Sequence, residues 1–145
     1  MSATAQTGYF FMPEHIILVG ASERPHSLGE RIFSHLLGSS YQGKITPVNL
    51  RHSSVAGIPS YSSLSKIPGQ ADLVVAVIPP DHYDSLFKAC RKKDLRHIIL
   101  IQDWENLPPE SCKNTRSIIQ KHHGDELNIT VCNSAGIQLP SLNLN

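Results

Sequence analysis

The residues best suited to chemistry in this chain of 145 residues belong to one short loop, which joins an apolar run to a segment with helical spacing. A strand, a tight glycine turn and a helix N-terminus bring free backbone N–H groups and the positive end of a helix dipole together, which favours a phosphate group. Gly20 admits backbone conformations closed to other residues, and the missing Cβ of Gly29 lets a ligand or a neighbouring strand come close. The candidate phosphate-binding residues are Gly20, Ala21, Ser22, Ser27, Leu28 and Gly29.

The spacing of this loop differs from the usual dinucleotide-binding turn. That turn reads G-x-G-x-x-G, whereas Gly20 and Gly29 stand nine residues apart. The strand-turn-helix context still predicts a phosphate site. The alternative is a structural turn followed by a helix that caps itself, because Ser27 and Glu30 have the spacing of a capping box.

The end of the second apolar stretch carries a positive charge where NAD-binding proteins carry an acid. It reads Asn49-Leu50-Arg51-His52. NAD sites place Asp or Glu there to hold the ribose hydroxyls, whereas arginine suits a phosphate on the ribose. Asn49 and Arg51 therefore predict a ligand with the 2′-phosphate of NADP or the 3′-phosphate of coenzyme A. A solvated surface arginine is the alternative for Arg51.

No group of residues in the sequence predicts a catalytic or metal site. Cys90, Cys112 and Cys132 are odd in number and widely spaced, which is typical of buried, reduced thiols rather than of disulfides or zinc ligands. His122-His123 has no further ligands at the spacing that a metal needs. We expect no catalytic residue and no metal.

The composition excludes several classes of partner. Thirteen basic residues oppose twelve acidic ones, so no basic field favours nucleic acid. No apolar run approaches the ~18–20 residues that cross a bilayer. The N-terminus lacks the pattern of a signal peptide, and its apolar patch Tyr9–Met12 is expected to pack against the domain. We expect a cytoplasmic protein with neither nucleic-acid nor membrane partners.

Five short apolar stretches, rich in β-branched residues and bounded by turn residues, are expected to form the strands that position the glycine loop. Their runs are continuous rather than alternating, which indicates strands of a parallel sheet covered on both faces. Helical patterns between them start after Ser27, at Asp81 and after Pro108. The expected strands are His15–Gly20, Lys44–Leu50, Asp72–Ile78, His97–Gln102 and Asn128–Cys132.

The helical patterns also predict which residues face inward. In the first helix these are Leu28, Ile32, Leu36 and Leu37, and Gly38 ends it. The second helix, to about Lys93, should bury Tyr83, Leu86, Phe87 and Cys90, and the third should run from Pro109 towards His122. Ser54–Gly69 has room only for a loop and a short helical turn around Ser62–Lys66.

Strands that alternate with helices predict an α/β, Rossmann-like, doubly wound fold: a single domain with a mainly parallel five-stranded sheet. Ligands of such folds bind at the carboxyl ends of the strands. This rule points to Pro79-Pro80 and to Gln102–Glu105. A plain break between a strand and a helix is the alternative for Pro79-Pro80. Trp104 in that last loop either stacks on an adenine, covers the pocket or plugs a surface groove.

Other polar residues have weaker predictions. His15, His26 and His52 flank the presumed site in the sequence. Arg91-Lys92-Lys93 with Arg96 forms a basic cluster, expected to be a solvated helix face or, second, a partner-docking surface.

The sequence resembles a known family, the CoA-binding domain of NDP-forming acyl-CoA synthetases, which are relatives of the succinyl-CoA synthetase α subunit. The resemblance covers residues 14 to 137, and its last segment, VCNSAGIQLP, is most similar to the N-terminal module of bacterial protein lysine acetyltransferases. Departures from the family pattern are Leu50, Gln102–Trp104 and Val131-Cys132. The segments that carry it are HIILVGAS, GERIFSHLL, GKITPVNLR, GIPSYSSL and ADLVVAVIPP.

The resemblance implies roles for the candidate residues. Gly20–Ser22 would line the CoA phosphates, Arg51 would stand where the family has a phosphate-binding lysine, and Ile78–Pro80 would lie beside the adenine. The cofactor would be coenzyme A or an acyl-CoA, and catalysis would belong to a synthetase or GNAT acetyltransferase domain, covalently following or separate. The alternatives are an NADP-binding oxidoreductase fragment and a degenerate module used for protein contact.

These predictions divide the chain at two boundaries. Residues 1–13 are expected to be an N-terminal tail and residues 14–137 the CoA-binding domain. Residues 138–145 are expected to be a C-terminal tail or the start of a linker.

Overall fold

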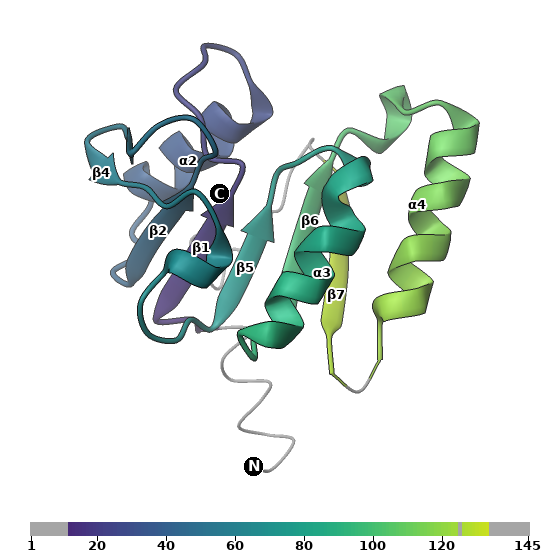
Figure 1. The fold of residues 1–145 in the computed structure, drawn as a ribbon. Helices are drawn as coiled ribbons and strands as arrows, with labels where there is room; N and C mark the ends of the chain where they lie inside the picture. Colours follow the sequence, from purple (N-terminus) through teal and green to yellow (C-terminus); the bar gives the residue numbers. More distant parts are fainter. Residues whose placement is uncertain (1–11, 125, 134–145) are drawn as a thin grey trace.

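The computed structural model describes residues 12–124 and 126–133. They form a five-stranded sheet in the order β2-β1-β5-β6-β7, in which each neighbouring pair is parallel (Figure 1). All five predicted strands are present, and the prediction of an α/β, Rossmann-like domain is confirmed. The strands are β1 (His15–Val19), β2 (Lys44–Val48), β5 (Leu73–Ala76), β6 (His97–Gln102) and β7 (Asn128–Asn133).

The sheet forms because its central strands are apolar on both faces. All four residues of β5 and the first five of β6 are buried. Along β1, Ile17 joins the core that includes Phe87, whereas Leu18 joins the core that includes Phe33. Burial of one such side chain stabilises the fold by about 1.5–3 kcal/mol. The sheet therefore needs a helical layer on each face.

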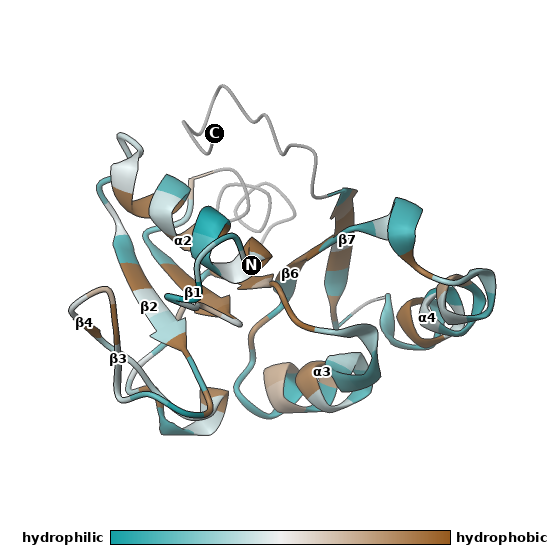
Figure 2. Ribbon diagram, turned by 90° about the horizontal axis from the view of Figure 1, so that it is seen from above, coloured by the Kyte–Doolittle hydropathy of each residue, from teal (hydrophilic) through white to brown (hydrophobic). Residues whose placement is uncertain are grey.

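The helices cover the two faces in turn. Helix α2 (Leu28–Gly38) lies on one face, and α3 (Tyr83–Lys92) and α4 (Pro109–His122) lie on the other (Figure 2). The loops that leave β1 and β5 therefore turn to opposite faces of the sheet. Neighbouring strands whose helices diverge in this way create the switch point at which ligands bind in doubly wound folds.

Helix α2 departs from its prediction in two details. The Ser27 hydroxyl oxygen accepts a hydrogen bond from the Glu30 N–H at 3.2 Å, but the Glu30 carboxylate accepts from the Ser34 hydroxyl, so the capping box is only half formed. The buried face is Gly29, Phe33 and Leu36, whereas Leu37 is 42% exposed. The predicted stripe is therefore wrong at Leu37, because the buried face is centred on Phe33.

The other two helices agree more closely with the sequence. A short 3-10 turn, η2 (Pro80–His82), takes the first residues of the second predicted helix, so α3 begins at Tyr83. Its four predicted inward residues are all buried. Helix α4 begins at Pro109, where proline is tolerated because the N–H of the first helical residue has no partner within the helix.

The connection from β2 to β5 contains a hairpin that the sequence analysis did not predict. Strands β3 (Ser54–Val55) and β4 (Ile58–Pro59) pair antiparallel, and η1 (Leu64–Lys66) follows in the predicted short turn. Ala56 and Gly57 both have positive φ, 49° and 76°, as in the usual two-residue hairpin turn. Strands of two residues are too short to produce a detectable alternation.

The ends of the domain give little further information. Met12 is 78% exposed, so it does not pack as predicted, and Tyr9, Phe10 and Phe11 lie outside the described residues. Most of both predicted tails lies outside them as well. Among the described residues, no helix combines the length and the hydropathy that a membrane crossing requires.

Candidate functional site

The glycine turn after β1 is fixed between two neighbouring strands. The Gly20 N–H donates to the Val48 carbonyl at 3.2 Å, and its φ is +93°. A Cβ at this position would lie 2.2 Å from the carbonyl oxygen of Val77, which follows β5. Only glycine therefore fits, and the turn lies where the ends of β1, β2 and β5 meet.

Gly29 brings the start of α2 onto the same turn. A Cβ on Gly29 would lie 2.2 Å from the Gly20 carbonyl oxygen and 3.3 Å from the Ser22 Cβ. The expectation that the missing side chain admits a ligand or a strand is thus corrected, because the close neighbour is the turn itself. The helix N-terminus and the glycine turn form one rigid unit.

This unit contains backbone and hydroxyl donors that have no partner among the described residues. Among the described residues, no hydrogen bond involves the backbone N–H groups of Ala21, Ser22, Leu28 or Gly29. The hydroxyl oxygen of Ser22 accepts from the Arg24 N–H at 3.0 Å, and that of Ser27 caps α2, so both hydroxyl hydrogens remain donors. A set of free N–H and O–H donors at a helix N-terminus fits a phosphate or pyrophosphate group.

The end of β2 is bonded to the turn through Asn49. The Asn49 Nδ2 donates to the Ala21 carbonyl at 2.9 Å. Its Oδ1 accepts from the N–H groups of Arg51 and His52 at 2.8 and 3.0 Å. One N–H of the amide is left for a ligand.

Arg51 follows at the surface with a free guanidinium group. The residue is exposed, and within the described residues its side chain forms no hydrogen bond or ion pair. Leu50, in the place of the family's proline, is 83% exposed. The end of β2 thus offers a positive charge next to the donor-rich turn, as the sequence predicted.

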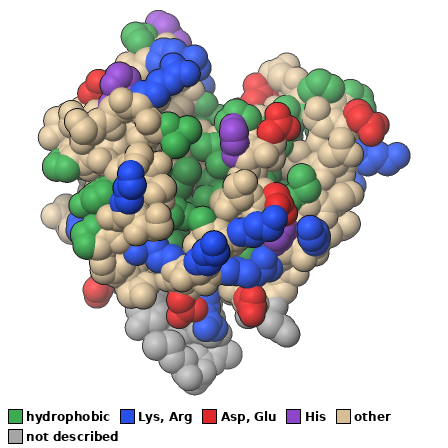
Figure 3. All heavy atoms as spheres, in the orientation of Figure 1, with side chains coloured by type: hydrophobic (Ala, Val, Ile, Leu, Met, Phe, Trp, Pro, Cys, Tyr) green, Lys and Arg blue, Asp and Glu red, His purple; other side chains and the backbone are tan. Residues whose placement is uncertain are grey.

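The end of β5 supplies the apolar side of the crevice. Ile78 is partly buried against the core, Pro79 is exposed, and Pro80 begins η2. Figure 3 shows that the surface is hollowed between the two halves of the molecule, with hydrophobic side chains in the hollow and basic and histidine side chains at its upper rim. The predicted site residues are therefore gathered around the switch point between β1 and β5.

Trp104 fills a groove at the end of β6 rather than lying free. It begins η3 (Trp104–Asn106), is partly buried, and packs against the core on the α3 side. Its Nε1–H donates to the Cys132 carbonyl at 3.2 Å. The geometry favours the plug among the alternatives for this residue.

His15 is misplaced by the sequence argument. Its ring nitrogens contact the Gln70 carbonyl at 2.8 Å and the Thr46 hydroxyl at 2.7 Å, at the beginning of β1. The expectation that it flanks the site is wrong, because it lies at the opposite edge of the sheet. His26 and His52 are exposed in loops at the carboxyl edge.

Glu23 is a functional candidate that sequence reasoning missed. Its carboxylate accepts a hydrogen bond from the Ala56 N–H at the tip of the β3–β4 hairpin. The loop after β1 is thereby joined to the hairpin as well as to Asn49. The only sequence signal is the Ala56-Gly57 turn, and nothing in the sequence indicates its partner.

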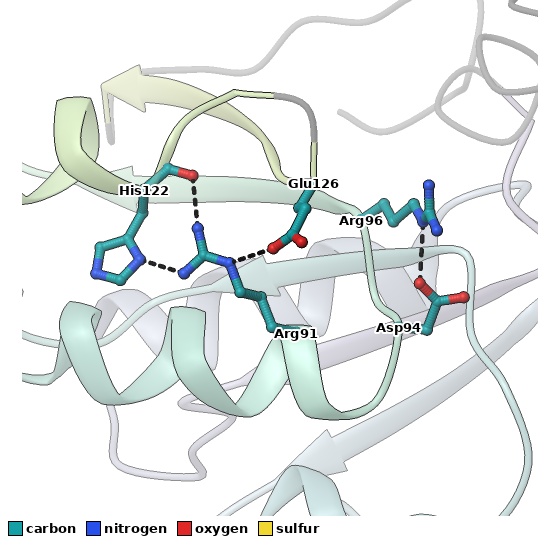
Figure 4. Close-up of polar contacts among 5 residues, drawn as sticks. All are labelled: Arg91, Asp94, Arg96, His122 and Glu126. Atoms are coloured by element: carbon teal, nitrogen blue, oxygen red, sulfur yellow. Dashed lines mark hydrogen bonds and ion pairs between the residues drawn. The ribbon is translucent and has the colours of Figure 1, made fainter.

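The basic cluster is neither a uniformly solvated face nor a free docking surface. Arg91 donates to the His122 Nδ1 at 2.5 Å and to its carbonyl at 3.1 Å, and forms an ion pair with Glu126 (Figure 4). Arg96 pairs with Asp94, and the Lys93 ammonium donates to the Ile67 carbonyl. Arg91 thus ties α3 to the end of α4, and the prediction of a solvated cluster is corrected at that residue.

The three cysteines differ in burial. All three cysteines are free, and burial raises the pKa of the Cys90 thiol to about 12. Burial also raises the pKa of Cys132, although Cys112 and Cys132 are only partly buried, so the expectation of three buried thiols holds for Cys90 alone. In the part of the chain that the structure describes, no group of three or more His, Cys, Asp or Glu residues could hold a metal.

A parallel sheet with a glycine turn, a helix N-terminus and a basic strand end at its switch point has the arrangement of the Rossmann-like, nucleotide-binding class. Residues 14–139 match the model of the CoA-binding domain family, and the chain belongs to that family. The predicted resemblance to the CoA-binding domain of NDP-forming acyl-CoA synthetases is confirmed. Coenzyme A is the cofactor of this family.

Known proteins agree with this assignment. The chain is 32% identical over 139 residues to the alpha subunit of acetate–CoA ligase (ADP-forming) II from Pyrococcus furiosus, covering 94% of this chain and 30% of that protein. The crystal structure of PH0766 from Pyrococcus horikoshii OT3 superimposes with a TM-score of 0.73 at 28% identity, covering 94% of this chain and 32% of that one.

A third protein shares the fold. Acetyl-coenzyme A synthetase 1 of Ca. Korarchaeum cryptofilum, in complex with phosphate and ADP, has a TM-score of 0.66 at 22% identity, covering 84% of this chain and 26% of that one. The chain therefore spans less than a third of the length of these relatives.

Proposed function

We propose that the domain binds coenzyme A or an acyl-CoA at the carboxyl edge of the sheet, with the ribose 3′-phosphate at Arg51. The observation that carries the proposal is the exposed guanidinium of Arg51, which has no partner among the described residues and lies beside a turn whose N–H donors also have none there. Guanidinium binds phosphate through two parallel N–H groups. Because the strand end has no carboxylate, an unphosphorylated ribose would leave that charge unused.

The other candidate residues would contact the pyrophosphate and the adenine of the cofactor. The free N–H groups of Ala21, Ser22, Leu28 and Gly29 would hold the pyrophosphate, with the hydroxyls of Ser22 and Ser27 as further donors. The adenine would lie against Ile78–Pro80. Coenzyme A, when bound, supplies a thiol that carries an acyl group as a thioester.

The domain would present this thioester to a catalytic domain rather than transform it. The relatives above support the function of an NDP-forming acyl-CoA synthetase, with its catalytic part following in the same protein or in a separate chain. A GNAT-type protein acetyltransferase is the alternative partner domain, supported by the VCNSAGIQLP segment. We place this function in the cytoplasm, in keeping with three free cysteines.

Two other functions use the same features. NADP also carries a ribose phosphate that Arg51 could bind, so an NADP-binding oxidoreductase fragment is the second candidate. A module that has lost its ligand and serves only in protein contact is the third, since Leu50, Gln102–Trp104 and Val131-Cys132 depart from the family pattern.

A thermal-shift panel of CoA, acetyl-CoA, NAD and NADP separates the three functions. At a concentration one hundred times its dissociation constant, a ligand that binds only the folded state adds about 2.7 kcal/mol to the free energy of unfolding. We expect CoA and acetyl-CoA to raise the melting temperature and NAD to leave it unchanged. A shift with NADP and none with CoA would favour the second candidate, and no shift with any of the four ligands would contradict both nucleotide-binding functions.

A further inference from the structure

We propose that Asn49 is a positioning residue that sets specificity for the ribose phosphate, by holding Arg51 beside the glycine turn. This inference rests on the proposed CoA-binding function. Arg51 is exposed and lies on an irregular segment. To distinguish CoA from dephospho-CoA, its guanidinium must be held at one position relative to the glycine turn. The geometry of the segment after β2 provides this restraint.

The side-chain amide of Asn49 bonds two segments of the backbone, the residues that follow β2 and the turn that follows β1. Its Oδ1 uses both lone pairs on the backbone N–H groups of Arg51 and His52, at 2.8 and 3.0 Å. This turn folds the segment back on the strand end and sets the direction in which the chain leaves β2. Its Nδ2 donates to the Ala21 carbonyl at 2.9 Å. One side chain therefore couples the backbone of Arg51 to the turn that would hold the pyrophosphate.

A second tie holds the far end of the same segment. Glu23, in the loop after β1, accepts a hydrogen bond from the Ala56 N–H, five residues beyond Arg51. Residues 50–54 between the two ties are exposed, whereas Val55 is 1% exposed. The Ser53 carbonyl accepts from the Ser60 N–H at 2.8 Å and Ser54 pairs with Pro59, so the stretch that depends on the ties is Leu50–His52. The segment that carries Arg51 is thus braced to one loop at both ends, and that loop supplies the phosphate donors.

A residue that positions Arg51 can be distinguished from one that only stabilises the fold by its effect on two ligands. CoA and dephospho-CoA differ only in the 3′-phosphate. Loss of a residue that merely stabilises the domain weakens both ligands alike. Loss of a residue that places Arg51 weakens CoA more, and so lowers the ratio of the two affinities.

The experiment measures the affinities of CoA and dephospho-CoA by titration calorimetry for the wild-type chain and its variants. Arg51→Ala defines the ratio without the guanidinium. We expect Asn49→Ala to lower the ratio by about threefold or more, the fold-change that corresponds to one ordinary hydrogen bond. In the Arg51→Ala background, Asn49→Ala should leave the ratio unchanged. Asn106→Ala is the matched control, since Asn106 bonds Asp103 in the loop after β6, at the same edge of the sheet.

Glu23 supplies a second, independent pair of variants. Glu23→Gln and Glu23→Ala both remove the negative charge, but only glutamine keeps an oxygen that can accept from the Ala56 N–H. We expect a lower ratio in Glu23→Ala than in Glu23→Gln. This pair also tests the bracing should Asn49→Ala fail to fold, which circular dichroism of each variant would reveal.

The outcomes separate the inference from the function on which it rests. If the wild-type chain binds neither ligand, the proposed function fails and the inference with it. If Arg51→Ala lowers the ratio while Asn49→Ala and Glu23→Ala leave it at the wild-type value, the function stands and the inference is wrong. Equal weakening of both ligands by Asn49→Ala would also overturn it, because the residue would then act on the parts that both ligands share and not on the 3′-phosphate.

Discussion

At the scale of single residues, two groups of residues make up the candidate site. Glycines allow its backbone segments to come into contact, and other residues carry the donors that we propose bind the cofactor. Gly20 and Gly29 let the strand ends, the turn and α2 meet, and a Cβ at either would lie 2.2 Å from a backbone oxygen. The free N–H groups and Arg51 face no protein partner among the described residues. Gly29 belongs to both groups, because its N–H is also a proposed phosphate donor, whereas the other proposed donors are residues that do not build the turn.

Arg51 gives the sharpest prediction at this scale. Replacing it with alanine removes a charge-assisted hydrogen bond at an exposed position, where such bonds are worth the lower end of about 1.5–3 kcal/mol or less. Arg51→Ala should therefore weaken CoA by roughly tenfold, or about 1.4 kcal/mol, and leave dephospho-CoA almost unchanged. Titration calorimetry of both ligands measures this, with His52→Ala as the exposed neighbouring control.

A conservative variant adds a check on the geometry. Arg51→Lys keeps the positive charge but loses the paired N–H groups, so its affinity for CoA should lie between those of the wild-type and Arg51→Ala chains. Equal weakening of CoA and dephospho-CoA by Arg51→Ala would contradict the role, and would show that the residue supports the loop.

At the scale of elements, α3 and α4 are joined by a polar network around a buried histidine. His122 is 5% exposed; its Nδ1 accepts from Arg91, so its Nε2–H donates to Asp84 Oδ1 at 2.7 Å. Hydrogen bonds from Lys88 and His122 lower the pKa of Asp84 to about 2 from a model-peptide value of 3.8. The network joins α3 to α4 in the helical layer that covers one face of the sheet.

The lowered pKa of Asp84 predicts how the fold responds to acid. Because the pKa is lower in the folded state, ionised Asp84 contributes stability above about pH 4, and that contribution is lost as the pH falls towards about 2. Asp84→Asn should therefore melt with a shallower pH dependence between pH 4 and pH 2 than the wild-type chain. Melting temperatures across this range measure the slope, with the exposed Asp81→Asn as control. An unchanged slope in Asp84→Asn would show that the network does not hold the carboxylate in its ionised form.

At the scale of the whole molecule, much of the fold could be predicted because its signals are local. The continuous apolar runs of β5 and β6 require cover on both faces, and helical patterns lie between them, so the parallel sheet follows from the sequence. The turn after β1 was predicted for the same reason. The hairpin was not, because two-residue strands have no periodicity, and the Glu23–Ala56 contact joins residues that are distant in the sequence. The prediction for His15 was wrong because His15 begins β1 whereas the glycine turn follows its end. The two are close in sequence but lie at opposite edges of the sheet.

The measurement that tests the central claim most directly is a titration of the isotope-labelled chain with CoA, followed by the shifts of its backbone amide resonances. We expect the amides of Ala21, Ser22, Leu28 and Gly29 to shift most and to saturate together, because their N–H groups, which have no partner among the described residues, would hold the pyrophosphate. The amide of Lys44, which begins β2 at the edge of the sheet opposite the site, should not move. No shifts with CoA, or shifts gathered around Lys44 while the amides of the glycine turn stay unchanged, would contradict the assignment of the carboxyl edge as the CoA site.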